Sequence, residues 1–151
     1  MKNVTKLLSI SAFALFLSAC QTVPEVIPED LSALQLIQRG QDAMGQQNYK
    51  AADAYYIACI ERYEDNLKTY VEARYELAQS NFKQKKYEIA KEMYTEIVNV
   101  FDDPNAIYQV QSKYKKLASL GLERIKAIED KKAAEEKKKA EKKAKRENKS
   151  K

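Results

Sequence analysis

Histidine and tryptophan are missing from this chain of 151 residues, and glycine and proline occur only three times each. Without histidine there is no Ser–His or Cys–His nucleophile pair and no histidine metal site, and the usual base at neutral pH is absent. Scarce glycine and proline beside abundant alanine, glutamate, lysine, leucine and tyrosine predict an all-α fold.

Few other groups remain that could carry chemistry. The sequence has no glycine-rich phosphate loop, and its two cysteines, Cys20 and Cys59, cannot form a zinc site alone. Cys59 falls where the helical pattern favours a small apolar residue, so we expect a buried and inert thiol. Paired carboxylates at Asp102 and Asp103 lie at a predicted helix end, where we expect solvation rather than catalysis. The chain is therefore predicted to be a non-enzyme without a metal or a dissociable cofactor.

Residues 1–19 have the pattern of a signal peptide rather than of a folded segment. Two lysines precede an apolar run of 13 residues, from Leu7 to Ala19, which is too short to span a bilayer comfortably. Residues 17–20, Leu-Ser-Ala-Cys, resemble a bacterial lipobox. This resemblance implies that Cys20 becomes the first residue after cleavage and carries acyl chains, which anchor a protein stably when there is more than one.

Two alternatives to the lipobox are an ordinary secretory signal with a chance cysteine and an uncleaved anchor. Gln21 follows the cysteine, and by analogy with bacterial sorting rules the lack of Asp at this position favours the outer membrane, with the protein facing the periplasm. Residues 20–30 carry two of the three prolines and almost no helical pattern, so they are predicted to form an extended tether.

A self-similarity with a period of 38 residues organises the segment 31–128, which is predicted to be the folded domain. Five residues at offsets 0, 4, 7, 8 and 11, one stripe of a helix, recur after this shift. The first set is Ala52, Tyr56, Cys59, Ile60 and Tyr63, and the second is Ala90, Tyr94, Ile97, Val98 and Phe101. A repeat of this length predicts stacked helical hairpins.

The apolar periodicity predicts four helices before a capping helix, with Asp30 or Ser32 as the first N-cap. The four are expected at about residues 31–46, 49–63, 68–84 and 87–101. The fifth is predicted to start near Asn105 and to carry Val110, Tyr114, Leu117, Ala118, Leu122 and Ile125. Gly40 lies inside the first helix at a cost of about 1 kcal/mol against alanine, so a packing reason is expected there.

These residues resemble the tetratricopeptide-repeat family. The first repeat, residues 33–66, matches its pattern at Gly40, Tyr49, Ala52, Tyr56 and Cys59, and the second, residues 71–104, matches at Leu77, Ala78, Phe82, Tyr87, Ala90, Tyr94 and Pro104. The initial Trp of the family is absent, Arg39 replaces the first Leu, and Glu64 stands where Pro is expected. The spacing between the repeats is most similar to envelope tetratricopeptide proteins such as the lipoprotein BamD and the C-terminal repeats of CpoB.

The resemblance implies a two-repeat solenoid with a capping helix, in which the first helix of each hairpin lines a concave groove. Carried over by position, the groove residues are Ile37, Gln38, Gln41, Met44, Tyr75, Glu76, Gln79, Phe82, Lys83, Lys115, Ser119 and Leu122. Aromatic side chains flanked by amides could hold an extended peptide or a helix. The alternative is that Met44, Tyr75 and Phe82 pack between the hairpins.

The formal net charge of +5 is concentrated near the C-terminus. Residues 130–151 hold 11 Lys and Arg against 5 Asp and Glu, whereas residues 21–129 hold 14 against 17. The lysine-rich tail, residues 129–151, is expected to be a solvated helical extension that frays into a disordered end. It either needs no partner or binds an anionic envelope polymer or lipid head group, whereas an exported protein is not expected to meet nucleic acid.

Together these features predict a lipid-anchored adaptor that binds a protein partner in an envelope complex through the groove. Three alternatives remain open: a BamD-like part in outer-membrane protein assembly, a pilotin-like secretion or pilus lipoprotein, and a tether from membrane to cell wall through the tail. The identity of the partner and the oligomeric state are not encoded in any motif.

Overall fold

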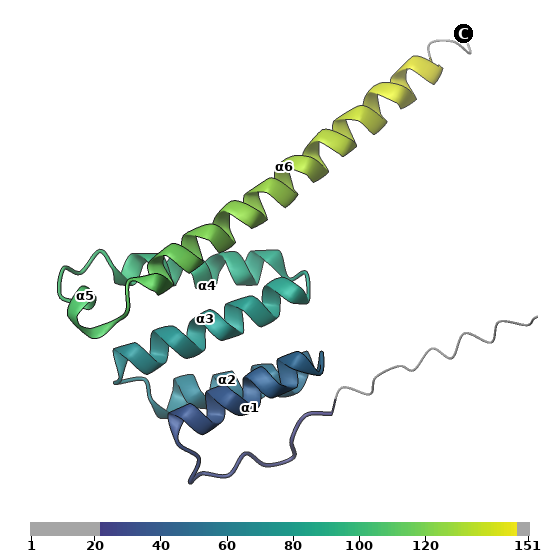
Figure 1. Cartoon of the computed structure of the whole chain (residues 1–151). Coiled ribbons are helices and arrows are strands. Elements are labelled where there is room, and N and C mark those ends of the chain that lie inside the picture. The colour runs from purple at the N-terminus through teal and green to yellow at the C-terminus, as the bar shows by residue number, and fades with distance from the viewer. Residues whose placement is uncertain (1–21, 148–151) are drawn as a thin grey trace, which may run out of the picture.

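The computed structural model describes residues 22–147, and within this range it contains six helices and no strand (Figure 1). The helices are α1 (Ala33–Gly45), α2 (Tyr49–Arg62), α3 (Leu67–Lys83), α4 (Tyr87–Val100), α5 (Ala106–Gln109) and α6 (Lys113–Glu147). The predicted all-α fold is confirmed. The predicted signal peptide, the lipidation residue Cys20 and the last four residues of the chain lie outside the described range.

The long helices stack in chain order as helical hairpins. Each of α1, α2, α3 and α4 packs on the next long helix, and α6 takes the place of the first helix of a third hairpin. Helix α1 also touches α3, and α3 touches α6, so the first helices of successive hairpins form one continuous layer (Figure 1). The structure therefore agrees with the expected helical-repeat solenoid.

Side-chain caps define where the first three helices begin. Ser32 caps α1: its hydroxyl accepts a hydrogen bond from the Gln35 backbone N–H, and its own N–H donates to Gln35 Oε1 at 2.9 Å. This reciprocal pair selects Ser32 over Asp30 as the N-cap. Asn48 and Asn66 cap α2 and α3 through their side-chain oxygens.

Two tyrosine rings pack directly on glycine backbones in the core. A Cβ atom added at Gly40 in α1 would lie 2.3 Å from Tyr56 Cε1. The same arrangement recurs between α6 and α4, where a Cβ atom at Gly121 would lie 2.6 Å from Tyr94 Cε2. Tyr56 and Tyr94 are repeat-equivalent and fully buried. The packing reason expected for Gly40 is confirmed, and Gly121 is a second such contact that the sequence analysis did not single out.

The predicted fifth helix is wrong in its first part. The chain forms the four-residue helix α5 and then leaves helical geometry at Val110, which has φ −117° and ψ 136°. Val110 is nevertheless buried in the core together with Tyr114, the second residue of α6. Val110 and Tyr114 are four residues apart, which is the spacing of one helical turn. The Val110 side chain nevertheless reaches the core from an extended backbone.

Residues 22–30 are irregular, as the tether prediction requires, but they are fastened to the α1–α2 hairpin. Arg62 donates hydrogen bonds from Nη1 and Nη2 to the carbonyl oxygens of Pro28 and Ile27, at 2.7 and 3.0 Å. Asn48 Nδ2 donates to the Thr22 carbonyl oxygen at 2.9 Å. Residues 22–30, which we call the strap, therefore lie against the α1–α2 hairpin and do not form a free linker.

Helix α6 extends well beyond the packed part of the molecule, which we call the body and which consists of α1–α5 and α6 as far as Glu129 (Figure 1). It has 35 residues, which corresponds to about 52 Å at the rise of an α-helix. Its side chains from Asp130 to Lys143 are all exposed, so this part forms an arm without a packed face. The expected helical extension is confirmed as far as Glu147. No helix within residues 22–147 is both long and apolar enough to cross a membrane.

Candidate functional site

A concavity of about 400 Å³ lies where α1 and α3 run side by side. It is lined by Gln41, Met44, Gly45, Tyr56, Tyr75, Glu76, Gln79 and Lys83. Six of the twelve predicted groove residues are in this set, and they come from both repeats. The structure thus gathers half of the predicted groove into one site, which we call the α1–α3 concavity.

Hydrogen bonds fix the polar side chains of the α1–α3 concavity. Gln41 Nε2 donates to Glu76 Oε1 at 2.9 Å and thereby joins α1 to α3. Gln79 Nε2 donates to the Tyr75 hydroxyl oxygen at 2.8 Å. Both amides keep a carbonyl oxygen that can accept a hydrogen bond from a ligand, and Tyr75 keeps a hydroxyl proton that it can donate.

Glu76 is the most unusual charged group in the site. Burial raises the pKa of its carboxyl group, and Glu72 raises it further, while the Gln41 hydrogen bond and the more distant Lys83 and Lys113 oppose the shift. Within residues 22–147 no Lys or Arg nitrogen forms an ion pair with Glu76, whereas Glu96, for example, pairs with Arg74. The concavity therefore contains a partly desolvated carboxylate that forms no ion pair with a described cation.

Tyr56 lines the concavity from α2 and was predicted only as a core residue. The side chain is 0% exposed, and its hydroxyl has no hydrogen-bond partner among the described residues. Burial raises the pKa of this hydroxyl, and the carboxylates of Glu76, Asp53 and Asp42 raise it further. Tyr56 is therefore a neutral donor and acceptor surrounded by negative charge.

Tyr75 belongs both to the concavity and to the core. Its ring lies 6.1 Å from the ring of Tyr94 and 5.6 Å from that of Tyr114, measured between centroids, in tilted arrangements. Such contacts are typical of packed aromatic clusters. The packing alternative is thus correct for one side of the Tyr75 ring, while the other side remains part of the concavity wall.

The other predicted groove residues lie elsewhere. Ile37 is only 5% exposed and packs in the core around Leu36 and Cys59, so its assignment to the groove is corrected. Phe82 packs against Tyr87 of α4 in a T-shaped arrangement, with the ring centroids 5.5 Å apart, so this contact lies within its own hairpin. Both positions follow the apolar stripe of their helices, which the family pattern alone does not separate from the groove face.

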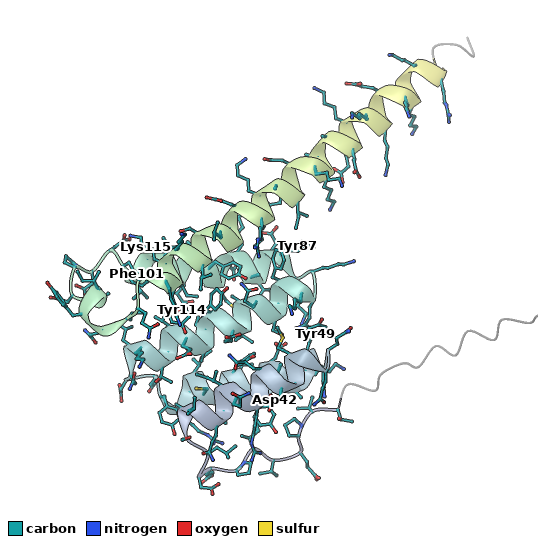
Figure 2. The ribbon with its side chains drawn as sticks, in the orientation of Figure 1. Asp42, Tyr49, Tyr87, Phe101, Tyr114 and Lys115 are labelled. Carbon is teal, nitrogen blue, oxygen red and sulfur yellow. The ribbon has the colours of Figure 1, made fainter. Side chains whose placement is uncertain are left out.

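The remaining assignments from α1 and α6 also fall outside the concavity. Gln38 is exposed and donates a hydrogen bond to Asp42 at 3.0 Å. Lys115 lies with its ammonium nitrogen 5.9 Å from the Phe101 ring centroid, at the end of the stack near α5 (Figure 2). Ser119 donates to the Lys115 carbonyl oxygen, and Leu122 packs against the core. The three α6 residues belong to the helix that packs on α3 and α4, and none of them lines the concavity between α1 and α3.

Cys59 behaves as an inert thiol. It is fully buried, and its Sγ lies 3.8 Å from the Ala33 carbonyl oxygen, to which it donates. Burial, with a smaller effect from Glu72, raises its pKa to about 11, although Arg62 opposes the shift. The prediction of a buried thiol is confirmed. In the described part of the chain no group of three or more His, Cys, Asp or Glu side chains could hold a metal ion.

Comparison with known proteins adds one relative. No family model matches the chain, and no solved structure matches it at a significant level. A protein of Treponema pallidum (strain Nichols), described as an uncharacterized protein, is 27% identical over 132 residues. The match covers 83% of this chain and 52% of that protein, so the chain spans about half the length of the relative. The description of that protein names no activity, ligand or partner.

Proposed function

We propose that this protein is an adaptor lipoprotein of the bacterial outer membrane, which binds a protein partner of the cell envelope in the α1–α3 concavity. One observation carries the proposal: six residues that family resemblance assigns to a binding groove come together from two repeats in a single concavity. The site combines aromatic rings, a methionine, two amides and two charged groups. This mixture of anchors and hydrogen-bonding groups suits a peptide segment better than a small apolar ligand.

The contacts of the strap with the α1–α2 hairpin are consistent with a protein that is anchored close to the membrane. Cys20, the proposed acylation site, precedes by two residues Thr22, whose carbonyl oxygen is bound by Asn48. Two residues of extended chain span about 7 Å. An acylated Cys20 would therefore place the adjoining end of the α1–α2 hairpin at the bilayer surface and limit how far the body can swing away.

A second candidate function, a tether from the membrane to an anionic envelope polymer, is favoured by the arm of α6. Lys131, Lys138, Lys142 and Lys145 recur at spacings of seven, four and three, which places them on one face of the helix. No ion pair links these four lysines to an acidic side chain in the described part of the chain. Their charge is therefore open to an external anion.

Co-purification after crosslinking in cells distinguishes the two functions. The concavity variant is Met44→Ala/Gln79→Ala, which shortens two lining side chains that are only partly buried. The matched control is Tyr108→Ala, because Tyr108 is a tyrosine 85% exposed on α5, outside the concavity. A third chain ends at Asp130 and lacks most of the arm. Circular dichroism first establishes that all variants are folded.

The adaptor function predicts a defined protein that co-purifies with the wild type, the Tyr108→Ala control and the shortened chain, but not with the concavity variant. Loss of the partner only from the shortened chain, or recovery of cell-wall polymer alone from every full-length sample, would contradict the adaptor function and support the tether.

A further inference from the structure

We infer that the partner inserts an arginine side chain into the α1–α3 concavity, where its guanidinium group pairs with the Glu76 carboxylate. The inference rests on the proposed adaptor function and specifies the chemistry of the segment that the adaptor binds. The observations that carry it are a carboxylate that forms no ion pair and further negative charge around the same concavity.

The first observation concerns the unfilled bonding capacity of Glu76. Among the described residues, its single hydrogen bond is the one that Gln41 donates to Oε1. A carboxylate accepts several hydrogen bonds, and withdrawing it from water without a cation is costly. A guanidinium group offers up to five N–H donors in a plane and bonds a carboxylate through two of them. Such a ligand relieves the cost that the isolated protein bears at Glu76.

The second observation is the negative charge around Tyr56, whose fully buried side chain lines the concavity from α2. Tyr56 and Glu76 line the same concavity, and the Glu76 charge acts on the Tyr56 hydroxyl. A guanidinium group matches the two oxygens of a carboxylate through two parallel N–H groups, whereas a lysine ammonium is a compact point charge without this fork.

The surroundings of these two groups favour a cation over an anion. Asp42 and Asp53 add negative charge near Tyr56, and Glu72 adds it near Glu76. The opposing cations are Lys83, exposed and lining the concavity, and Lys113, which acts on Glu76 without pairing with it.

The walls fit the rest of an arginine side chain. Tyr75 presents an aromatic surface on which a guanidinium group can stack. Met44 supplies an adaptable apolar contact for the methylene groups that precede the guanidinium. Metal cations are a weaker alternative, because the described residues hold no cluster of three ligating side chains.

The test begins with selection of a random dodecapeptide display library on the immobilised full-length protein. We expect the selected peptides to share an arginine at one position. The tightest peptide is then labelled with fluorescein, and its dissociation constant is measured by anisotropy with the wild type, Glu76→Gln and a control, Glu88→Gln. Glu88 is an exposed carboxylate in the first turn of α4 and does not line the concavity. A second peptide carries citrulline, the neutral isostere of arginine, at the shared position.

We expect Glu76→Gln and the citrulline peptide each to weaken binding by roughly 10- to 100-fold, because each removes one member of a close charge pair. Combining the two changes should cost little more than either alone, because both remove the same interaction. Glu88→Gln should leave the dissociation constant unchanged.

Two results overturn the inference in distinguishable ways. In the first, the selected peptides share no basic residue, and their binding is weakened by Met44→Ala/Gln79→Ala but not by Glu76→Gln. This result would retain the concavity as a binding site and exclude the arginine. Peptides that are unaffected by every concavity variant, or a failure to select any peptide, would count against the adaptor function and the arginine together.

Discussion

At the scale of single residues, the glycine–tyrosine contacts fix the distance between neighbouring helices. Gly40 and Gly121 each meet the ring of a fully buried tyrosine. Both rings are enclosed by the core, so neither can swing aside to admit a methyl group. The third glycine, Gly45, has no atom within 4 Å of an added Cβ and provides an internal comparison.

Replacing Gly121 by alanine should lower the free energy of unfolding by about 1–3 kcal/mol, because the added methyl group overpacks the contact with Tyr94. Gly45→Ala should be neutral or stabilising by up to about 1 kcal/mol, since alanine favours the helix and meets open space. Urea denaturation of both variants measures the difference. Equal stabilities would contradict the packing that the structure shows at Gly121.

The raised pKa of Cys59 should make the free energy of unfolding depend on pH. Its ordinary pKa of 9.0 rises to about 11 on burial, so the unfolded chain releases the thiol proton at lower pH than the folded chain does. The contribution of Cys59 to stability is therefore complete below pH 9.0 and is lost as the pH rises to about 11. Urea titrations at pH 8 and pH 10.5 should show a smaller loss of stability for Cys59→Ala than for the wild type. An identical loss in both proteins would contradict the burial of the thiol.

At the scale of helices and turns, much of the architecture could be predicted from the sequence. The 3.6-residue stripes located the four helices of the two hairpins to within one or two residues, because each stripe must be buried against the next helix. The break at Val110 was not predictable from periodicity, since an extended residue that points into the core satisfies the same spacing as a helical one.

The candidate site was predictable only in part, for a related reason. Gln41, Glu76 and Gln79, which the first-helix pattern assigned to a groove, line the concavity together. Ile37 and Phe82 are on the same helices but are rotated into the core. Tyr56 has a core signature in the sequence, and only the packing of α2 beneath α1 and α3 shows that it also borders the concavity.

The turns that close the two hairpins share a strained residue. Gln47 and Lys85, which are 38 positions apart, have φ values of 59° and 62°. This left-handed conformation costs a residue with a Cβ roughly 1–2 kcal/mol, and a β-branched residue bears a larger penalty than an unbranched one. The two hairpins therefore share the backbone conformation of their turns as well as their apolar pattern.

Lys85→Gly should leave the free energy of unfolding unchanged or raise it by up to about 1 kcal/mol, whereas Lys85→Val should lower it by about 1–2 kcal/mol. Lys86→Val is the matched control, because Lys86 is the exposed neighbour of Lys85 and has a negative φ of −83°. Thermal unfolding followed by circular dichroism orders the three variants. A Lys85→Val protein as stable as the control would show that the turn adopts another conformation in solution.

At the scale of the whole molecule, the body and the arm are physically independent. The body buries its apolar residues in clusters that end with Ile125, and the side chains from Asp130 to Lys143 are all exposed. The ion pairs of Lys91 with Glu129 and of Lys126 with Asp130 lie where α6 leaves the body. The arm can therefore contribute reach and charge, but not packing.

A chain that ends at Asp130 should keep the melting temperature of the full chain to within about 2 °C, because no buried apolar surface is lost. Its helical signal per molecule should fall, since the removed residues as far as Glu147 are helical. Calorimetry and far-ultraviolet circular dichroism measure the two quantities. A large drop in melting temperature would mean that the arm packs against the body or against a second copy.

The concavity is tested most directly as a binding site by photo-crosslinking in living cells. A benzophenone amino acid replaces Gln79 in the concavity, Tyr108 on α5, or Lys138 in the arm, one position at a time. Our interpretation predicts a protein adduct of defined mass from position 79, and none of that mass from position 108. An adduct that forms only from position 138, or equally from positions 79 and 108, would contradict the assignment of the α1–α3 concavity as the site where this protein binds its partner.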